Sequence, residues 1–174
     1  PMTGAVTTAD ATANGVSVRE ATVRDLDAVL ELRLSLLREH PEHPIYGRLR
    51  ADVTTRAREL FSAQLRAEKE TIFLGEIEGV VAGILRCVES IGSPLLEPAR
   101  YAYVSSVYVR PEMRRRGVLR ALMRSADAWS RARGIDQMRL HNVAGSSSAE
   151  GAWSALGFDV VEQVRVRSVP ARTT

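Results

Sequence analysis

Arginines crowd around one glycine where a strand-like run passes into an amphipathic helix, a combination that suits an anionic ligand. The stretch VYVRPEMRRRGVLRALMRSADAW, residues 107–129, places Arg114, Arg115 and Arg116 directly before Gly117. The first backbone N–H groups of a helix have no partner within it and point outward at its positive end. Guanidinium groups grip phosphate oxygens in pairs, and a glycine leaves room for a ligand near the backbone. The turn therefore predicts a pyrophosphate site.

Local sequence also allows an interpretation without a ligand. A solvated arginine cluster can follow an ordinary strand, with Gly117 only easing the turn. The known phosphate loops GxxxxGK[ST] and GxGxxG are absent. Their absence disfavours a nucleotide bound in either of these familiar cradles.

Length and composition predict a single domain. The chain has 174 residues, of which 45% are hydrophobic and 26% charged, and we expect one globular domain over residues 16–168. Residues 1–15 are rich in Thr, Ala and Gly and are expected to form a disordered tail, with Pro1 ahead of Met2 as a remnant of expression. Residues 169–174 are expected to be a flexible C-terminus.

Charge, cysteine content and hydropathy disfavour several classes of protein. No run of 18 apolar residues occurs, so we expect no membrane span and a cytoplasmic protein. Cys87 is the single cysteine, and His40 and His43 form an H-x-x-H interrupted by prolines that lacks a third ligand, so we expect no metal. The formal net charge is only +3, with Lys69 the single lysine, which favours a phosphate-bearing ligand over a nucleic-acid partner.

The apolar pattern predicts the elements that must position the turn. Thr22-x-x-Asp25 is typical of a helix start, and Gly134 and Gly157 are typical of helix ends. The expected order is β-α-α-β-β-β-α-β-α-β, an α/β fold with a mixed sheet and helices on its faces. The expected elements are a strand (16–20), helices (26–39 and 54–70), a hairpin (71–90), a strand (101–110), a helix (118–133), a strand (137–143), a helix (146–156) and a strand (158–166).

Two motifs carry a resemblance to a known family. VYVRPEMRRRGVLRAL, with Arg114-x-x-Gly117-x-Leu119, closely resembles motif A of the GNAT superfamily of N-acetyltransferases, whose acetyl-CoA signature is [Q/R]-x-x-G-x-[G/A]. AEGAWSALGF, residues 149–158, is similar to the next helix of the family, A-x-x-x-Y-x-x-x-G-F. The resemblance covers most of residues 16–167. It implies a GNAT-like fold, in which a central mixed, mostly antiparallel sheet has two parallel strands that splay apart at the CoA site and helices on both faces.

The resemblance implies a binding site for acetyl-CoA as cosubstrate. The main chain of the strand before the turn would pair with the pantetheine arm, and the amides of the turn would hold the diphosphate with help from the arginine side chains. The cofactor-binding residues so implied are Val107, Tyr108, Val109, Arg114, Arg115, Arg116, Gly117, Val118, Leu119 and Arg120.

Two positions depart from the family pattern. Leu119 stands at the second small position, where a bulky side chain is expected to shift the helix start or weaken CoA binding. Trp153 stands where many members carry Tyr, and an indole cannot protonate the departing thiolate. Ser147-x-x-Glu150 is a capping box, which we favour over a contact between these serines and CoA.

The acceptor side must remove a proton from the attacking amine. Many members of the family place a Glu on the strand before motif A, where this chain offers Tyr103 and Ser105. Glu89, at the end of the neighbouring strand, is therefore the expected proton acceptor, with a plain surface carboxylate as the alternative. In the family, the joint between the first two helices often walls the acceptor pocket. The substrate-binding residues so implied are His40, His43 and Tyr46, with a capped helix end as the simpler alternative.

Together these expectations describe an acetyl-CoA-dependent N-acetyltransferase that acts in a ternary complex on a primary amine of a small molecule or peptide. A non-catalytic CoA-binding sensor or scaffold of the same fold is the first alternative, and a basic nucleic-acid-binding module is the weaker second. A homodimer is possible in such a fold. Four carboxylates near the acceptor wall would favour a cationic acceptor if they converge. They are Glu39, Glu42, Glu89 and Glu97.

Overall fold

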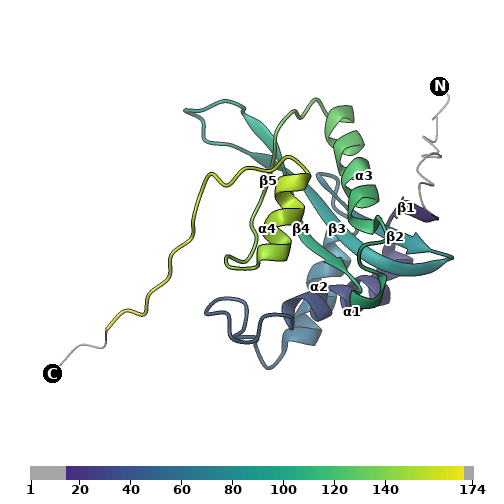
Figure 1. Ribbon diagram of the computed structural model, residues 1–174, viewed down its shortest axis with the longest axis horizontal. Coiled ribbons are helices and arrows are strands. Elements are labelled where there is room, and N and C mark those ends of the chain that lie inside the picture. The colour runs from purple at the N-terminus through teal and green to yellow at the C-terminus, as the bar shows by residue number, and fades with distance from the viewer. Residues whose placement is uncertain (1–14, 171–174) are drawn as a thin grey trace.

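A five-stranded mixed sheet forms the centre of the molecule (Figure 1). The computed structural model describes residues 15–170, so most of the predicted tails, 1–15 and 169–174, lies outside the described residues. The strands lie side by side in chain order, and neighbours run antiparallel except β4 and β5, which run parallel. The predicted mixed, mostly antiparallel sheet is confirmed. The strands are β1 (Val16–Glu20), β2 (Glu70–Ile77), β3 (Val80–Ile91), β4 (Arg100–Val109) and β5 (Met138–Leu140).

Helices cover both faces of this sheet, as expected (Figure 1). On one face α1 and α2 bury Leu32 and Phe61 in an apolar cluster that includes Tyr108. On the other face α3 buries Leu122 in a second cluster, against which Trp153 of α4 packs. Within residues 15–170, no helix is both long and apolar enough to cross a membrane. The helices are α1 (Leu26–Leu37), α2 (Val53–Gln64), α3 (Val118–Ala132) and α4 (Ser147–Ala155), with short 3-10 helices η1 (Val23–Asp25) and η2 (Pro111–Met113).

Three predicted elements differ in the structure. The helix predicted at 54–70 ends at Gln64, because Glu70 already pairs with β3 as the first residue of β2. The strand predicted at 137–143 is reduced to the three residues that pair with β4. The strand predicted at 158–166 is absent, and this segment is extended and mostly exposed. An alternating apolar pattern forms a strand only where a sheet edge receives it.

A β-bulge divides β4 into two halves. The pairing with β3 shifts by one residue between Ser105 and Tyr108, and Ser106 between them has a φ of 55°, in the left-handed region. Val104 and Val107 consequently lie on the face under α3. Ser105 and Tyr108 lie on the face under α1. The bulge thus adds Tyr108 to the side of the sheet that carries Tyr103.

A capping box at Thr22 begins η1, the 3-10 turn that leads into α1, and confirms the helix start predicted there. The Asp25 carboxylate accepts hydrogen bonds from the Thr22 backbone N–H and from the Arg19 guanidinium, both at 2.8 Å. These contacts, above all the hydrogen bond from Arg19, lower the pKa of Asp25 from 3.8 to about 2.

Replacing Asp25 by asparagine is expected to lower the free energy of unfolding by about 1–2 kcal/mol at pH 7. The folded-state pKa is depressed, so the contribution of the carboxylate is complete above the unfolded value of 3.8 and is lost as the pH falls toward about 2. Urea unfolding of both proteins at pH 7 and pH 3 measures this effect. The stability difference should shrink at pH 3, and an equal difference at both pH values would contradict the assignment.

Candidate active site

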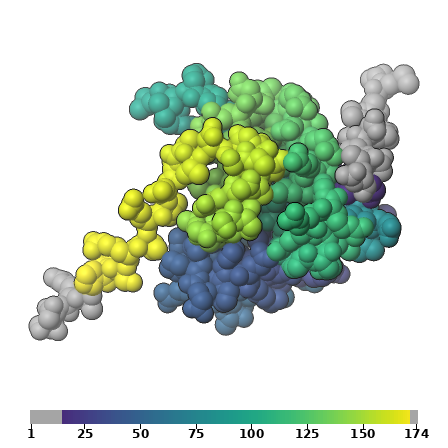
Figure 2. Space-filling view, viewed as in Figure 1, coloured from purple at the N-terminus to yellow at the C-terminus, as the bar shows by residue number. Residues whose placement is uncertain are grey.

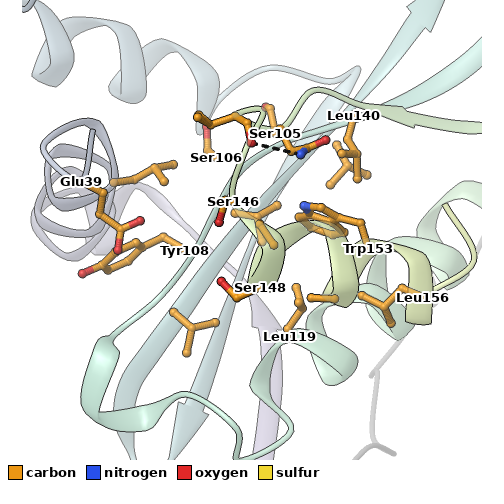
Figure 3. Close-up of a pocket in the computed structure, with 18 of the residues that line it drawn as sticks. Glu39, Ser105, Ser106, Tyr108, Leu119, Leu140, Ser146, Ser148, Trp153 and Leu156 are labelled. Carbon is orange, nitrogen blue, oxygen red and sulfur yellow. Dashed lines mark hydrogen bonds between the residues drawn. The ribbon is translucent and has the colours of Figure 1, made fainter. Parts of the chain in front are cut away.

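A cavity of about 1000 Å³ opens where β4 and β5 separate. The two strands pair only between Ala102–Val104 and Met138–Leu140, so within residues 15–170 the rest of β4 has no strand beside it on this edge. The end of α1, the start of α3 and the start of α4 enclose the space (Figure 3). The predicted site residues that line it are His40, Tyr46, Tyr103, Ser105, Val107, Tyr108, Val109, Arg114, Arg115, Gly117, Val118, Leu119 and Arg120.

The turn before α3 presents a run of free backbone amides to this cavity. α3 begins directly after Gly117, whose φ of 88° lies in the left-handed region that glycine adopts without strain. Arg115 also has a positive φ, of 63°. Within residues 15–170, no amide of residues 115–120 donates a hydrogen bond to another protein group. Such a run at the positive end of a long helix suits the diphosphate of CoA.

The side chain of Arg114 turns away from these amides toward the wall formed by α1. Its Nε donates to the Val109 carbonyl oxygen at 2.9 Å. Its guanidinium pairs with the Glu39 carboxylate and lies 5.7 Å from the centre of the Tyr108 ring. The arginine predicted to hold phosphate thus contacts the opposite side of the cavity.

The other arginines of the turn lie at different positions relative to the cavity. Arg115 and Arg120 line it and are exposed, so they are placed to contact an anion held by the amides. Arg116 is also exposed but does not line the cavity. The structure therefore brings two of the predicted arginine side chains to the candidate phosphate site.

Leu119 is accommodated beside α4 (Figure 3). It is half-buried and, like Trp153 and Leu156, packs against the cluster under α3. The expected shift of the helix start is wrong, because α3 begins at Val118 directly after the glycine. Trp153 meets Phe158 edge to face, with ring centroids 5.7 Å apart. Leu119, Trp153 and Leu156 form the wall of the cavity on the α4 side.

The start of α4 differs from the predicted capping box. Ser146, and not Ser147, is the N-cap residue, and its side chain makes no capping hydrogen bond. Glu150 instead accepts a hydrogen bond from the backbone N–H of Gly145 at 3.3 Å. Ser146 and Ser148 lie on the cavity side of α4 (Figure 3), where their hydroxyls add polar groups to an otherwise apolar wall.

Tyr103 and His141 form a hydrogen-bonded pair at the edge of the cavity. The Tyr103 hydroxyl oxygen lies 2.9 Å from Nδ1 of His141, and both residues line the cavity. Partial burial raises the pKa of Tyr103, so the phenol keeps its proton at neutral pH. It can then donate to Nδ1 of His141 in the tautomer that carries its ring proton on Nε2. Sequence reasoning gave His141 no role and missed this pair.

Glu89, the expected proton acceptor, is not brought to the cavity. It pairs with Arg100 at 2.8 Å, near the end of β3. Its register partner Ala102 belongs to the cluster under α3, whereas Tyr103 faces the other side of the sheet. The hydrogen bond from Arg100 lowers the pKa of Glu89 and keeps it charged. This carboxylate is part of a surface ion pair, as the alternative interpretation of the sequence had it.

The loop after α1 brings His40 and Tyr46 to the cavity but not His43. His43 Nδ1 accepts hydrogen bonds from the backbone N–H groups of Ile45 and Tyr46 at 3.2 and 3.1 Å. Its ring also stacks on Tyr46 at 4.7 Å, so His43 holds the shape of the loop. Across residues 15–170, no three His, Cys, Asp or Glu side chains are grouped to hold a metal ion.

The side of the cavity where the resemblance places the acceptor carries little negative charge. Leu36, Leu37 and Tyr46 line it, and the carboxylate of Glu39 is paired with Arg114. The four carboxylates whose convergence would favour a cationic acceptor therefore do not converge here. Those that do not line the cavity are Glu42, Glu89 and Glu97.

The fold and this cavity define the class of protein. Free amides before a long helix, at a gap between two parallel strands, are the arrangement that the motif A resemblance implies for acyltransferases that hold acetyl-CoA. A model of the Acetyltransferase (GNAT) family matches residues 31–158. The chain belongs to the GNAT family, a family of acetyl-CoA-dependent N-acetyltransferases.

Individual relatives agree with this assignment. A segment of 64 residues, 37% of this chain, is 38% identical to the aminoglycoside N(6')-acetyltransferase type 1 of Klebsiella aerogenes and spans 42% of that protein. The fold is similar to a GCN5-related N-acetyltransferase from Ralstonia eutropha, with a TM-score of 0.72 and 21% identity over 88% of this chain and 99% of that one. It is also similar to AAC(6')-Iy in complex with the bisubstrate analog CoA-S-monomethyl-acetylneamine, with a TM-score of 0.70 and 20% identity over 90% of this chain and 99% of that one.

Proposed function

We propose that this protein transfers the acetyl group of acetyl-CoA to a primary amine of a small molecule. The observation that carries the proposal is the run of free amides at residues 115–120, at the edge of a cavity large enough for both ligands. Acetyl-CoA, when bound, supplies an acetyl group activated as a thioester. The amides and the exposed side chains of Arg115 and Arg120 hold its diphosphate. Among the described residues, no strand pairs with the edge of β4 beyond Val104 on this side, so that edge is available to its pantetheine arm.

Tyr103 and His141 are the groups in this proposal that accept the proton of the attacking amine. The amine N–H donates to the Tyr103 oxygen while the tyrosine O–H donates to His141 Nδ1. As the amine nitrogen forms its bond to the acetyl carbon, the tyrosine proton moves to Nδ1 and the amine proton replaces it. Trp153 cannot act as an acid. The hydroxyls of Ser146 and Ser148, at the start of α4, line the cavity and are the groups in this proposal that donate a hydrogen bond to the departing sulfur.

Two classes of amine are the acceptors to test. The curated relative is named for acetylation of the 6'-amine of aminoglycosides, which makes an amino sugar the first class. The wall of Leu36, Leu37, Tyr46 and Tyr108 has one carboxylate, Glu39, beside it. This wall favours a second class, amines with a single positive charge and an aromatic or aliphatic body.

Turnover is measured as release of free thiol from acetyl-CoA with a chromogenic thiol reagent. The panel pairs an aminoglycoside that carries a 6'-amine with a matched one that carries a 6'-hydroxyl, and a phenylalkylamine with the corresponding alcohol. Thiol release that needs the amine in either pair supports the proposal and identifies the class. Binding of acetyl-CoA without turnover of any amine would favour the sensor alternative instead.

The single thiol of the protein should not disturb this measurement. Cys87 is fully buried, and its burial raises its pKa to about 11, so the reactive thiolate is scarce. The native protein is expected to react with less than about a tenth of one equivalent of reagent in the time of an assay. In guanidinium chloride it should react with one equivalent. Fast labelling of the native protein would show that Cys87 is accessible.

A further inference from the structure

A smaller pocket, which we call the α1–α2 pocket, lies between these two helices beside the cavity. Its volume is about 290 Å³, close to the lower end of the range for ligand pockets, so it has room for one end of a small ligand. Leu36, Leu37 and Ser106 line both spaces, so the pocket adjoins the cavity there. In Figure 2 the surface of α1, α2 and the loop between them (blue) lies beside α4 (yellow-green), which walls the opposite side of the cavity. The pocket is therefore on the side where the resemblance places the acceptor.

The lining of this pocket is apolar but carries positive charge. Apolar side chains of both helices, among them Leu36 and Phe61, make up most of it. The charged side chains that line it are Arg33, Arg50 and Arg56. Among the described residues, no carboxylate lines it. An apolar pocket with a few guanidinium groups suits a ligand that carries an anionic group on an apolar body.

Arg33 holds its charge in this pocket without an acidic partner. Its Nη1 donates a hydrogen bond to the side-chain oxygen of Gln64 at 2.8 Å, and its guanidinium lies 4.0 Å from the centre of the Phe61 ring. Within residues 15–170 no carboxylate forms an ion pair with it, and the nearby Glu70 is paired with Arg86. Burial, with the charge of Arg86, lowers the pKa of Arg33 to about 10, so the guanidinium remains charged at neutral pH. In the described part of the chain it donates this single hydrogen bond, so most of its N–H groups are left for a ligand.

Arg50 and Arg56 add positive charge at the start of α2. Both are exposed, and both pair with Asp52, at 3.1 and 2.6 Å. One carboxylate between two guanidinium groups leaves a net positive charge there. The three arginines of the lining therefore attract an anion and disfavour a ligand with several positive charges.

We propose that the acceptor carries a carboxylate, which binds to Arg33 in the α1–α2 pocket while the reacting amine lies in the cavity beside Tyr103. This inference rests on the proposed function and narrows its second class of acceptor to an amine whose apolar body ends in a carboxylate. The body lies along Leu36 and Leu37, which line both spaces. Guanidinium N–H groups form charge-assisted hydrogen bonds to a carboxylate, which are about twice as strong as neutral ones. An aminoglycoside offers no carboxylate and several positive charges, so it fits this pocket poorly.

Turnover with matched acceptors tests this specificity. The panel is a series of unbranched ω-aminoalkanoates of increasing length, each paired with the ω-aminoalkanol of the same length, and thiol release from acetyl-CoA is measured. At least one acid is expected to exceed its alcohol by at least about 10-fold in kcat/KM, the effect of a hydrogen bond to a charged group. Acids that are no better than their alcohols at every length overturn the proposal.

Calorimetric titration without acetyl-CoA tests the pocket apart from the reaction. The unmodified protein should bind an acid of this series at least about 10-fold more tightly than its alcohol. Arg33→Gln should remove most of this preference, whereas Arg33→Lys keeps the charge and should keep part of it. Arg38→Gln is the matched control, because Arg38 is an exposed arginine at the end of α1 that lines neither space, and the preference should stay within about threefold. Equal losses of preference in Arg33→Gln and Arg38→Gln overturn the proposal.

The two measurements separate this inference from the acetyl transfer on which it rests. Binding of an acid through Arg33 without turnover of any amine supports the carboxylate site and counts against acetyl transfer. Turnover of amines with no preference for the acid in either measurement supports acetyl transfer and overturns the inference. Thermal unfolding checks that the variants are folded, and the comparison of acid with alcohol in the unmodified protein needs no variant.

Discussion

Replacing Gly117 by valine is expected to weaken acetyl-CoA binding at least about 100-fold, which corresponds to about 2.7 kcal/mol. The residue has a φ of 88°, a region that costs a β-branched side chain of order 1–3 kcal/mol. Gly117 also lines the cavity next to the free amides of residues 115–120, so a larger residue here reduces the space for the ligand. Calorimetric titration with acetyl-CoA measures the affinity directly.

The other end of α3 provides a matched control. Gly134 has a φ of 66° and open space around the position of an added Cβ. Gly134→Val therefore imposes comparable backbone strain on the same helix, far from the cavity, and should leave the affinity within about threefold. Thermal unfolding checks that both variants are folded. Equal losses of affinity in the two variants would mean that strain in α3, and not occupation of the turn, governs binding.

Removing the imidazole of His141 is expected to lower kcat about 100-fold, within the usual range for a group that takes a proton in the transition state. Tyr103→Phe removes only the hydroxyl and should lower kcat by about 10-fold to 100-fold. Neither change touches the turn at Gly117, so the affinity for acetyl-CoA should stay within about threefold. Steady-state kinetics with the best amine of the panel, together with calorimetry, separates the two quantities.

Tyr101 gives the control for this pair. It lies two residues before Tyr103 on the same face of β4, with the Arg139 guanidinium over its ring, and it does not line the cavity. Tyr101→Phe should leave kcat unchanged within about twofold. The double variant tests whether Tyr103 and His141 act together. If its kcat falls by the product of the two single-variant factors, the residues act independently and the proposed relay is contradicted.

The fold followed from patterns that are local in the chain. The strand and helix periods, the box at Thr22 and the glycines at 134 and 157 located nearly every element, and the resemblance around Gly117 implied the mixed sheet that the structure has. The exception, the segment 158–166, is a strand by composition. Its state depends on whether an edge is available to it, which no local pattern specifies.

The part of the candidate site that consists of backbone amides could be predicted from the sequence. The amides before α3 follow from the position of Gly117 between a strand and a helix. The pair of Tyr103 and His141 depends on the register of β5 against β4, and the side of the sheet on which Tyr108 lies depends on the bulge at Ser106. Glu89 was misplaced for the same reason, because the face of β3 that meets α3 is set by packing between elements distant in sequence.

Arg114 connects the two sides of the cavity, the turn before α3 and the wall at the end of α1. Its main chain leads directly into the free amides, while its side chain holds the Val109 carbonyl oxygen and the Glu39 carboxylate of the opposite wall. A cosubstrate that reorders the turn therefore changes the free energy of the acceptor wall. Linkage is reciprocal, so an acceptor bound at that wall must alter the affinity for the cosubstrate by the same factor. The order in which acetyl-CoA and the acceptor bind then depends on this coupling between the two sides of the cavity.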